Sequence, residues 1–392
     1  MSRNRKLALL AGALSLVMAA GACSSGGSSS SSSGSGGALP AASGSQSLKG
    51  VCPNPVVVQT NWFPEAEHGA VYQLLGPGYK IDAPHKKITG PLVSEGKDTG
   101  VQIEIRAGGP AVGFQATEAL MYQDPKITLG LAQSDELVQF SQSQPVISVV
   151  APLDLDPQII MWDPKSHPDW HTIADIGQTN TKVLYFGGTG TYMEYLIGSG
   201  ILRRQQVDPS YDGSPSNFVA SGGKIAVQAF ATQEPYQYQN EVKAWHKPVA
   251  FQLVTDTGYP NYANTLAIRA DKKGELSNCL KRLVPMVQRG QVGFMTNSNN
   301  AIDAIVKASD AYRGIPYSKG NAQFAVDQMR RLGIVGNGND GTLGNFDMAR
   351  ITKLIGIVSP IFTSQKKKIR QNLKPDDIVT NEFIDSSVAL KS

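Results

Sequence analysis

The chain has few cysteines, and none of them forms a pattern typical of a metal centre. Only three of its 392 residues are cysteine and five are histidine, and no spacing among them resembles a zinc site. A Gly-Lys-Ser/Thr phosphate loop and a Gly-x-Ser-x-Gly nucleophile turn are also missing. These absences remove the sequence signatures of a zinc protein, a phosphate-loop nucleotide hydrolase and a serine hydrolase.

The chain also lacks a large excess of either charge. Its net charge is +4, of which Arg3, Arg5 and Lys6 supply three, and residues 1–22 contain no acid. The remainder therefore carries +1, which is no argument for nucleic acid as a partner. The basic run at 366–370 is interpreted as a solvated surface rather than a functional patch.

The one long apolar run is N-terminal. It spans Leu7–Ala20, follows three basic residues and is too short to cross a bilayer comfortably. The sequence Ala20-Gly21-Ala22-Cys23 resembles a bacterial lipobox, which implies a signal peptide at 1–22 and a lipidated Cys23. An ordinary signal peptide with an incidental cysteine is the alternative. We expect an exported protein, anchored by Cys23 to the outer face of the bacterial cell membrane, with a flexible Ser/Gly tether at 23–50.

Two cysteines remain beyond the anchor. Cys52 precedes the first predicted strand, and Cys279 lies in a later helical segment. An exported compartment permits a disulfide between them, while two free thiols are the alternative.

Short apolar runs alternate with helical patterns, which predicts an α/β fold with a mostly parallel sheet in each lobe. About 340 residues follow the tether, more than one core usually supports. We expect lobe 1 to comprise 51–155 and 256–392, and lobe 2 to comprise 156–255. The predicted strands are 55–59, 101–106, 127–133, 146–153, 158–162, 182–186, 225–231 and 249–255. The predicted helices are 114–122, 134–140, 192–201, 276–287, 301–312, 322–332 and 348–362.

The most informative segment follows the first strand. It places Trp62, Pro64 and His68 where a strand ends and a helix begins. In an open α/β sheet, ligands bind at the carboxyl ends of strands. This segment therefore predicts one wall of a ligand site.

The same segment, Trp62-x-Pro64-x-x-x-His68-Gly69-x-x-Tyr72, resembles the signature of solute-binding proteins related to pyrimidine-precursor binding proteins. The wider group includes the nitrate, sulfonate and taurine binders of ABC importers. Weaker likenesses follow in the expected order at 130–136, 145–153, 230–235 and 375–385, the last as a closing helix. The segment 77–99 departs from the family pattern and is interpreted as an inserted surface loop.

The resemblance implies a two-lobed periplasmic-binding-protein fold (type II-like) with a two-strand hinge. It implies a small-molecule ligand, ABC permease and ATPase subunits as partners, a monomer, no cofactor and no nucleic acid. An enzyme related to hydroxymethylpyrimidine synthases would carry a cysteine-rich motif, which this chain lacks, so we expect a binder and not an enzyme. A lipoprotein scaffold that binds no small molecule is a third possibility.

Eight residues are candidates for ligand contact, each with a structural alternative. Trp62 would stack on a planar ligand or pack in the core, and His68 would donate or accept a hydrogen bond or cap a helix. Glu234 would accept hydrogen bonds from an amino group or cap a helix. Gln133 and Ser134 form a polar strand end, Thr189 and Thr191 lie in a glycine-rich turn that suits a polar ligand atom, and Tyr236 is a possible aromatic wall. These residues favour a planar, nitrogen-containing solute over nitrate, sulfonate or taurine.

Overall fold

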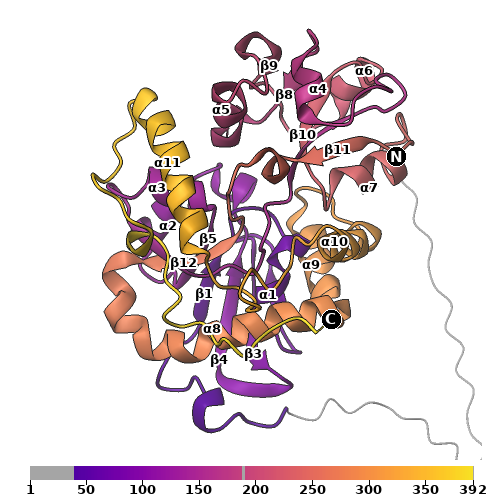
Figure 1. Cartoon of the computed structure of the whole chain (residues 1–392). Helices are drawn as coiled ribbons and strands as arrows, with labels where there is room; N and C mark the ends of the chain where they lie inside the picture. Colours follow the sequence, from indigo (N-terminus) through magenta and orange to yellow (C-terminus); the bar gives the residue numbers. More distant parts are fainter. Residues whose placement is uncertain (1–38, 188–189, 392) are drawn as a thin grey trace, which may run out of the picture. The chain divides into compact units, whose positions relative to one another are not determined.

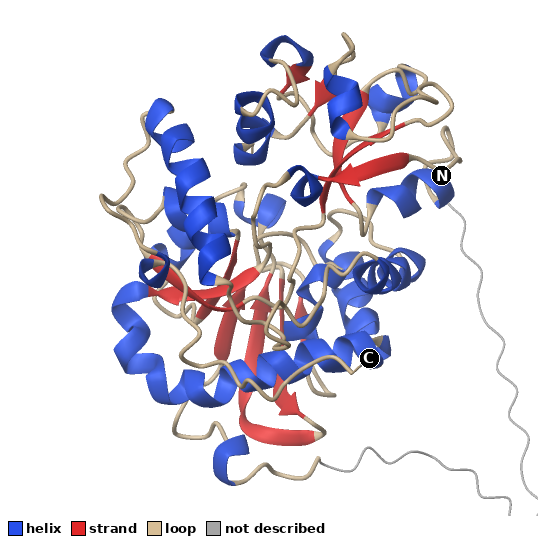
Figure 2. Ribbon diagram, viewed as in Figure 1, coloured by secondary structure: helices blue, strands red, loops and turns tan. Residues whose placement is uncertain are grey.

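The computed structural model describes residues 39–187 and 190–391. Two mixed β-sheets organise these residues, and helices cover both (Figures 1 and 2). The first sheet has the order β2-β3-β4-β1-β5-β12-β6 and the second has the order β11-β7-β10-β8-β9. We refer to the first sheet with its helices as lobe 1 and to the second as lobe 2.

The strands of lobe 1 are β1 (Val56–Gln59), β2 (Lys80–Asp82), β3 (Lys87–Ser94), β4 (Lys97–Arg106), β5 (Leu129–Ala132), β6 (Val146–Val150) and β12 (Thr265–Arg269). Those of lobe 2 are β7 (Gln158–Trp162), β8 (Val183–Leu184), β9 (Val207–Asp208), β10 (Ala226–Phe230) and β11 (Ala250–Leu253). Strands β1, β5, β6 and β7 are buried along their whole length, because both faces of their sheets are covered.

The α-helices are α1 (Gly69–Tyr72), α2 (Thr117–Gln123), α3 (Ser134–Gln139), α4 (Ile173–Gly177), α5 (Thr191–Gly198), α6 (Ser216–Ala220), α7 (Glu234–Asn240), α8 (Lys273–Thr296), α9 (Asn299–Tyr312), α10 (Lys319–Arg331) and α11 (Met348–Ser364). Helix α8 buries residues three and four apart, such as Leu276, Leu280, Leu283 and Val287, and thereby presents an apolar stripe to α1 and β6. No helix in the described part of the chain has the length and apolar character needed to cross a membrane.

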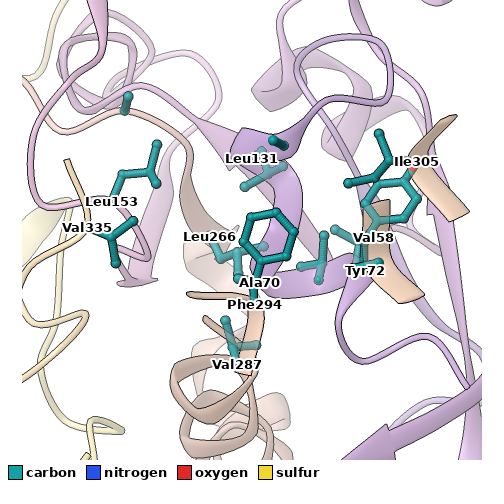
Figure 3. Packing of buried hydrophobic residues seen from close by; sticks show 14 of the residues in the cluster. Val58, Ala70, Tyr72, Leu131, Leu153, Leu266, Val287, Phe294, Ile305 and Val335 are labelled. Carbon is teal, nitrogen blue, oxygen red and sulfur yellow. The ribbon is translucent and has the colours of Figure 1, made fainter. Parts of the chain in front are cut away.

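The core of lobe 1 lies between the sheet and helices α1, α8 and α9. Figure 3 shows Val58 and Leu131 of adjacent strands facing Tyr72, Phe294 and Ile305. All five side chains are buried. This packing fixes the segment 61–73 against lobe 1, so its polar residues are held in place rather than carried on a mobile loop.

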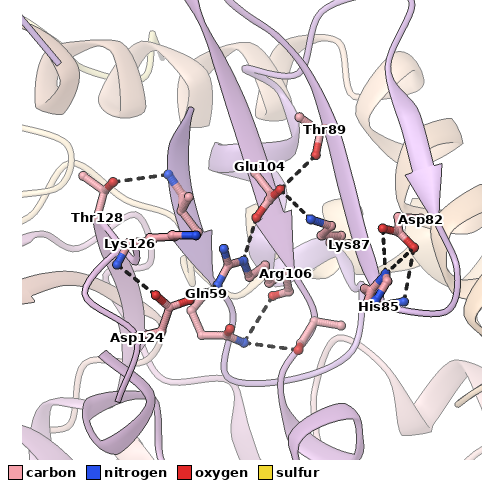
Figure 4. Close-up of polar contacts among 12 residues, drawn as sticks. Gln59, Asp82, His85, Lys87, Thr89, Glu104, Arg106, Asp124, Lys126 and Thr128 are labelled. Atoms are coloured by element: carbon pink, nitrogen blue, oxygen red, sulfur yellow. Dashed lines mark hydrogen bonds and ion pairs between the residues drawn. The ribbon is translucent and has the colours of Figure 1, made fainter. Parts of the chain in front are cut away.

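Polar side chains of β4 lie on the opposite face of the sheet, because Glu104 and Arg106 alternate with the core residues Ile103 and Ile105. Glu104 on β4 bonds to Lys87 Nζ at 3.0 Å and Arg106 Nε at 2.7 Å, and Arg106 reaches Asp124 at 2.7 Å (Figure 4). Desolvation alone would raise the pKa of Glu104, but Lys87 and Arg106 together lower it below its ordinary value. The carboxylate is therefore a charged cross-strand partner that holds β3 on β4.

The chain passes between the sheets twice. The first connection joins β6 to β7 through 151–157, and the second joins β11 to β12 through 254–264. Leu155 and Thr255, near which the sequence predicts the crossings, lie in these two segments. Asn261 of the second connection donates to Asp156 of the first at 2.8 Å, so the connections are bonded to each other.

Helix α11 holds both connections through Arg350. Its guanidinium donates to the carbonyl oxygen of Asp154 at 2.7 Å, to that of Pro260 at 3.0 Å and to that of Asn261. Asp347 caps the helix by accepting from the Ala349 and Arg350 amides, which orients the first turn toward the connections.

Three expectations from the sequence need correction. The sheets are mixed rather than mostly parallel, because β12 runs antiparallel to β5 and β6, and β7 runs antiparallel to β10 and β11. Segment 77–99 is not a loop: it forms β2, β3 and the start of β4, and Gly90 and Pro91 obscured its alternation. The segment 375–385 is not a helix beyond one short turn at Pro375–Asp377, after which Val379 pairs with Ser148 of β6.

The structure also bears on the predicted tether and on the predicted disulfide. Residues 39–50 of the predicted 23–50 tether pack on lobe 1, where Leu48 is fully buried and Ala42 donates to Asp98 of β4. Cys52 and Cys279 are joined in a disulfide that links the start of the fold to α8. Cys23 and the signal peptide lie outside the described residues.

Candidate ligand site between the two sheets

Polar side chains meet at the edge of the first sheet that faces lobe 2. Asn61 follows β1, Gln133 follows β5, and Asn264 precedes the antiparallel β12, so all three lie at the same edge. Asn61 Nδ2 donates to Asn264 Oδ1 at 2.7 Å, and the Asn264 amide donates to Gln133 Oε1 at 3.2 Å. This row of amides forms the rim of lobe 1.

His68 joins the row from the first turn after the rim. Its Nε2 lies 3.1 Å from Asn61 Oδ1 and 3.4 Å from Glu65 Oε1. The ring is 1% exposed, and burial lowers the pKa of His68 to about 3. The imidazole is therefore neutral at physiological pH, and its contact with Glu65 is a hydrogen-bonding contact rather than an ion pair. Its Nδ1 has no partner among the described residues.

Three carboxyl groups lie next to this rim. Glu65 and Glu67 come from lobe 1 and are nearly fully buried, and Glu234 begins α7 of lobe 2 and is partly exposed. Burial, reinforced by Glu67 and Glu234, raises the pKa of Glu65 well above its ordinary value. Burial also raises the pKa of Glu67, and it raises the pKa of Glu234 to about 7 although the Phe230 amide donates to Glu234 at 2.7 Å.

Glu67 spans the two lobes. Its Oε1 accepts a hydrogen bond from Thr232 Oγ1, which follows β10 of lobe 2. Its Oε2 is buried and has no hydrogen-bond partner among the described residues. A buried carboxylate oxygen without a donor is costly, so this oxygen marks a place where a donor from a bound molecule would be stabilising.

The basic residues do not balance these acids. In residues 39–187 and 190–391 no lysine or arginine forms an ion pair with Glu65, Glu67 or Glu234. The arrangement offers carboxyl oxygens from both lobes as hydrogen-bond acceptors, and a bound cation would favour the ionised form of these groups. It therefore suits amino, amidine or ammonium groups and opposes anions.

Other contacts also cross between the lobes. Tyr236 of α7 packs on Phe324 of α10, with ring centroids 5.5 Å apart, and Phe114 of lobe 1 packs on Phe186 of lobe 2 at 5.5 Å. With the Glu67–Thr232 hydrogen bond, these contacts show that the facing edges touch. The two lobes are therefore in direct contact at three separate places.

The residues predicted from the sequence fall into three groups. Trp62, His68, Gln133 and Glu234 lie at the facing edges described above. Ser134 is fully buried and donates to Asn261, Thr191 is the first residue of α5, and Tyr236 contacts Phe324. Thr189 lies outside the described residues.

Several residues at this interface carry no recognisable sequence signal. Glu67 is as easily interpreted as a helix-start residue as a ligand contact, and Thr232, Asn264 and Tyr317 lie in three separate connecting segments. Tyr317 enters because its hydroxyl accepts from the Ala66 amide at 3.1 Å. Only the fold brings these groups together. The only sequence cue to Glu67 is that it lies within the Trp62–His68 segment that follows the first strand.

Surface depressions lie elsewhere. One is lined by Pro53, Thr128, Arg269 and neighbouring residues, which precede β1, precede β5 and end β12. These positions are at the opposite end of the strands from Asn61 and Gln133. The depression is therefore separate from the interlobe residues. Because ligands bind at the carboxyl ends of strands in open α/β sheets, the interlobe residues are the better candidates for a ligand site.

Solved structures of bacterial binding proteins resemble this chain. The periplasmic aliphatic sulphonate binding protein SsuA from Escherichia coli matches with TM-score 0.51 and 13% identity, over 86% of this chain and 95% of that one. A putative sulfonate-binding protein from Methylobacillus flagellatus KT matches with TM-score 0.52 and 13% identity, over 85% and 93%. No protein-family model matches the chain, and no curated protein matches its sequence. At these identities the likeness concerns the fold, and the chain has the two-lobed fold of periplasmic binding proteins.

Proposed function

We propose that the protein is an extracytoplasmic substrate-binding protein of an ABC importer that captures a small solute between its lobes. The fold is that of periplasmic binding proteins, and in such folds two lobes close on a ligand. The main support for the proposal is the position of Glu67 between the two lobes. One oxygen of this residue bonds to Thr232 of the other lobe, and the other oxygen has no hydrogen-bond donor in the described part of the chain.

The solute we propose is planar, contains nitrogen and carries a positive charge or several N–H donors. Glu65, Glu67 and Glu234 provide acceptors from both lobes, and Trp62, from the same segment as Glu65 and Glu67, would provide an aromatic surface. A pyrimidine precursor with an amino group is one member of this class. Nitrate and sulfonates, which the fold relatives suggest as the alternative, would meet three acidic groups and no paired cation.

The role of His68 in this proposal is to bind and not to catalyse. The ring is neutral, held by Asn61 and buried beside Glu65. Its Nδ1 acceptor adds a further site for an N–H group. We therefore propose a binder without enzymatic activity, and without a cofactor.

A calorimetric panel tests the ligand class. Purified residues 39–392 are titrated with 4-aminopyrimidine, benzamidine, methanesulfonate and nitrate. We expect binding by the first two and none by the anions. The variant Glu67→Gln is expected to lose roughly tenfold in affinity, because a charge-assisted hydrogen bond contributes about 1.5 kcal/mol or more.

The control is Glu275→Gln, which makes the same chemical change at an exposed carboxylate in the first turn of α8, at the opposite end of the strands from the interlobe residues. This variant should bind like the wild type. Binding of methanesulfonate or nitrate, with no response to the amines, would overturn the proposed ligand class and favour the anion-binding alternative.

The membrane anchor and the transporter are a separate part of the proposal. Lipidated Cys23 would tether the protein near an ABC permease and its ATPase. Cys23→Ser in the full-length chain should move the protein from the membrane fraction to the soluble extracytoplasmic fraction. Retention of the variant in the membrane would contradict the lipid anchor without affecting the ligand proposal.

A further inference from the structure

A row of three aromatic rings crosses from one lobe to the other beside the acidic groups. The Trp62 and Phe114 rings lie 5.9 Å apart, and the Phe114 and Phe186 rings lie 5.5 Å apart, both pairs in a tilted arrangement. Trp62 and Phe114 belong to lobe 1, and Phe186 follows β8 of lobe 2. Phe114 is thus the middle ring of an aromatic bridge between the lobes.

Phe114 has two features that core packing does not explain. Its side chain is 54% exposed, and it is the one large hydrophobic residue of the described chain that is classed as exposed. Its backbone has φ +60°, a left-handed conformation that is unfavourable for a bulky residue. Strain of this kind persists where surrounding structure enforces it, and it is frequent at ligand clamps.

The backbone around Phe114 is held rigidly to Trp62. Gly108 donates to the Trp62 carbonyl at 3.0 Å, and the Phe114 amide donates to the Gly109 carbonyl at 2.9 Å. A Cβ added to Gly109 would lie 2.6 Å from the Trp62 ring, so the indole rests directly on this backbone. The Phe114 side chain therefore extends toward lobe 2 from a backbone segment that hydrogen bonds hold in place.

The opposite ring is fixed as well. The Phe186 amide donates to Gln228 Oε1 of β10 at 2.7 Å. Strands β8 and β10 are parallel neighbours, so Phe186 and the Thr232–Glu234 segment emerge at the same edge of the second sheet. Trp62 and Glu67 likewise emerge together after β1. The aromatic bridge and the acidic groups are therefore two sides of one interlobe site.

We propose that Phe114 is a specificity-determining residue that covers the apolar face of the solute while the carboxyl groups bind its nitrogen atoms. This inference rests on the proposed function and adds a selection rule to it. A flat cation with an aromatic ring is accepted, and an equally charged cation without a ring is bound less tightly. The exposed, strained ring has a purpose in this scheme because its partner is the ligand together with Phe186.

Benzamidine and acetamidine separate the two recognition elements, because they share an amidinium group and differ in the ring. We expect the wild type to prefer benzamidine. Phe114→Gly should weaken benzamidine binding by about five- to tenfold, the range of one aromatic contact, and leave acetamidine binding within about twofold. Glu67→Gln should weaken binding of both amidines.

The same variant also provides the control for misfolding. Glycine tolerates positive φ, so Phe114→Gly should unfold at the same temperature as the wild type or higher. A loss of ring preference in a variant that is at least as stable cannot come from misfolding. Phe251→Ala, which removes a partly exposed ring from the middle of edge strand β11, should keep the wild-type preference.

The outcomes separate this inference from the proposed function. Binding of both amidines with an unchanged ratio in Phe114→Gly would overturn the role of Phe114 and leave the carboxylate site intact. Equal weakening of both amidines in that variant would also overturn it, because the ring would then act on closure rather than on the ring of the solute. Failure of the wild type to bind either amidine would overturn the cation site and this inference together.

Discussion

Burial shifts the pKa values of three titratable interlobe groups, Glu67, Glu234 and His68. Burial raises the pKa values of the two acids and lowers that of the imidazole. In each case the neutral form is favoured, since desolvation penalises charge. These shifts reduce the charge that the interlobe region carries without ligand, and a cationic ligand would draw protons off the acids as it binds.

Glu234 gives this region a measurable pH dependence. Its pKa rises from an ordinary value of 4.5 to about 7, so between these pH values the folded protein binds a proton that the unfolded chain has released. The free energy of unfolding should therefore fall as pH rises through this window. Glu234→Gln should be more stable than the wild type at pH 8, by about 1–3 kcal/mol, and equally stable at pH 4.5.

Urea unfolding at the two pH values measures this difference. Glu275→Gln, which changes an exposed carboxylate on α8, serves as the control and should show no such pH-dependent gain. An equal gain at both pH values would mean that the carboxyl group is not protonated in the folded state.

The motif around His68 was visible in the sequence, but its environment was not. Trp62, Pro64 and His68 at the end of a hydrophobic run indicate a strand-end site by local pattern alone. The partners of Glu67 cannot be predicted in this way, since Thr232 is 165 residues away and meets it only when both sheets are formed. Phe114 was missed because the predicted helix over 114–122 includes it, whereas α2 begins at Thr117 and Phe114 has φ +60°.

Gly69 illustrates how a motif residue serves packing. It begins α1, and a Cβ at this position would lie 2.3 Å from the Phe294 ring of α8. Gly69→Ala should therefore force the two helices apart and destabilise the protein by about 1–3 kcal/mol. Chemical denaturation measures the loss.

Gly274 in the first turn of α8 is the matched control, because nothing lies within 4 Å of its added Cβ. Gly274→Ala should be neutral or stabilise by up to about 1 kcal/mol, the difference in helix propensity. A similar loss for both variants would show that the cost arises from helix backbone effects and not from the Phe294 contact.

The elements themselves were largely predictable, and the exceptions have physical reasons. Long amphipathic helices such as α8, α9 and α11 follow from their 3.6-residue period. Strand β3 was missed because Gly90 and Pro91 interrupt it, and its ladder tolerates them through a register shift between Pro91 and Val93. Strand direction in the sheets was mispredicted because alternation of elements does not specify the antiparallel return of β12.

The disulfide connects two elements that are far apart in the chain. Cys52 and Cys279 are 227 residues apart, so the bond closes a long loop in the unfolded state. Cys52→Ala/Cys279→Ala should lower the free energy of unfolding by roughly 3–5 kcal/mol. Thermal unfolding with and without reductant should show that the wild type falls toward the double variant, and an unaffected midpoint would contradict the structural role of the bond.

At the scale of the whole molecule, contact between the lobes depends on Gly320 of α10, which leaves room for Tyr236 of α7. A Cβ on Gly320 would lie 2.0 Å from the Tyr236 hydroxyl oxygen. Gly320→Val should hold the lobes apart and weaken ligand binding by roughly tenfold, because fewer molecules reach the closed state. Small-angle scattering should show a larger radius of gyration than for the wild type.

Two comparisons check that interpretation. Gly356→Val in α11, where nothing lies within 4 Å, should leave the radius of gyration unchanged. Adding Tyr236→Ala to Gly320→Val should restore closure, since the clashing hydroxyl is removed. A double variant that stays expanded would place the obstruction elsewhere.

Arg350 determines which part of the molecule can move. Because one guanidinium bonds to both connecting segments, at Asp154 and at Pro260 and Asn261, the two segments are held together at this point. The compliant lengths are the short stretches beyond it, next to β7 and β11. Lobe 2 would then rotate relative to lobe 1 mainly about one hinge axis, and twisting between the lobes would be resisted.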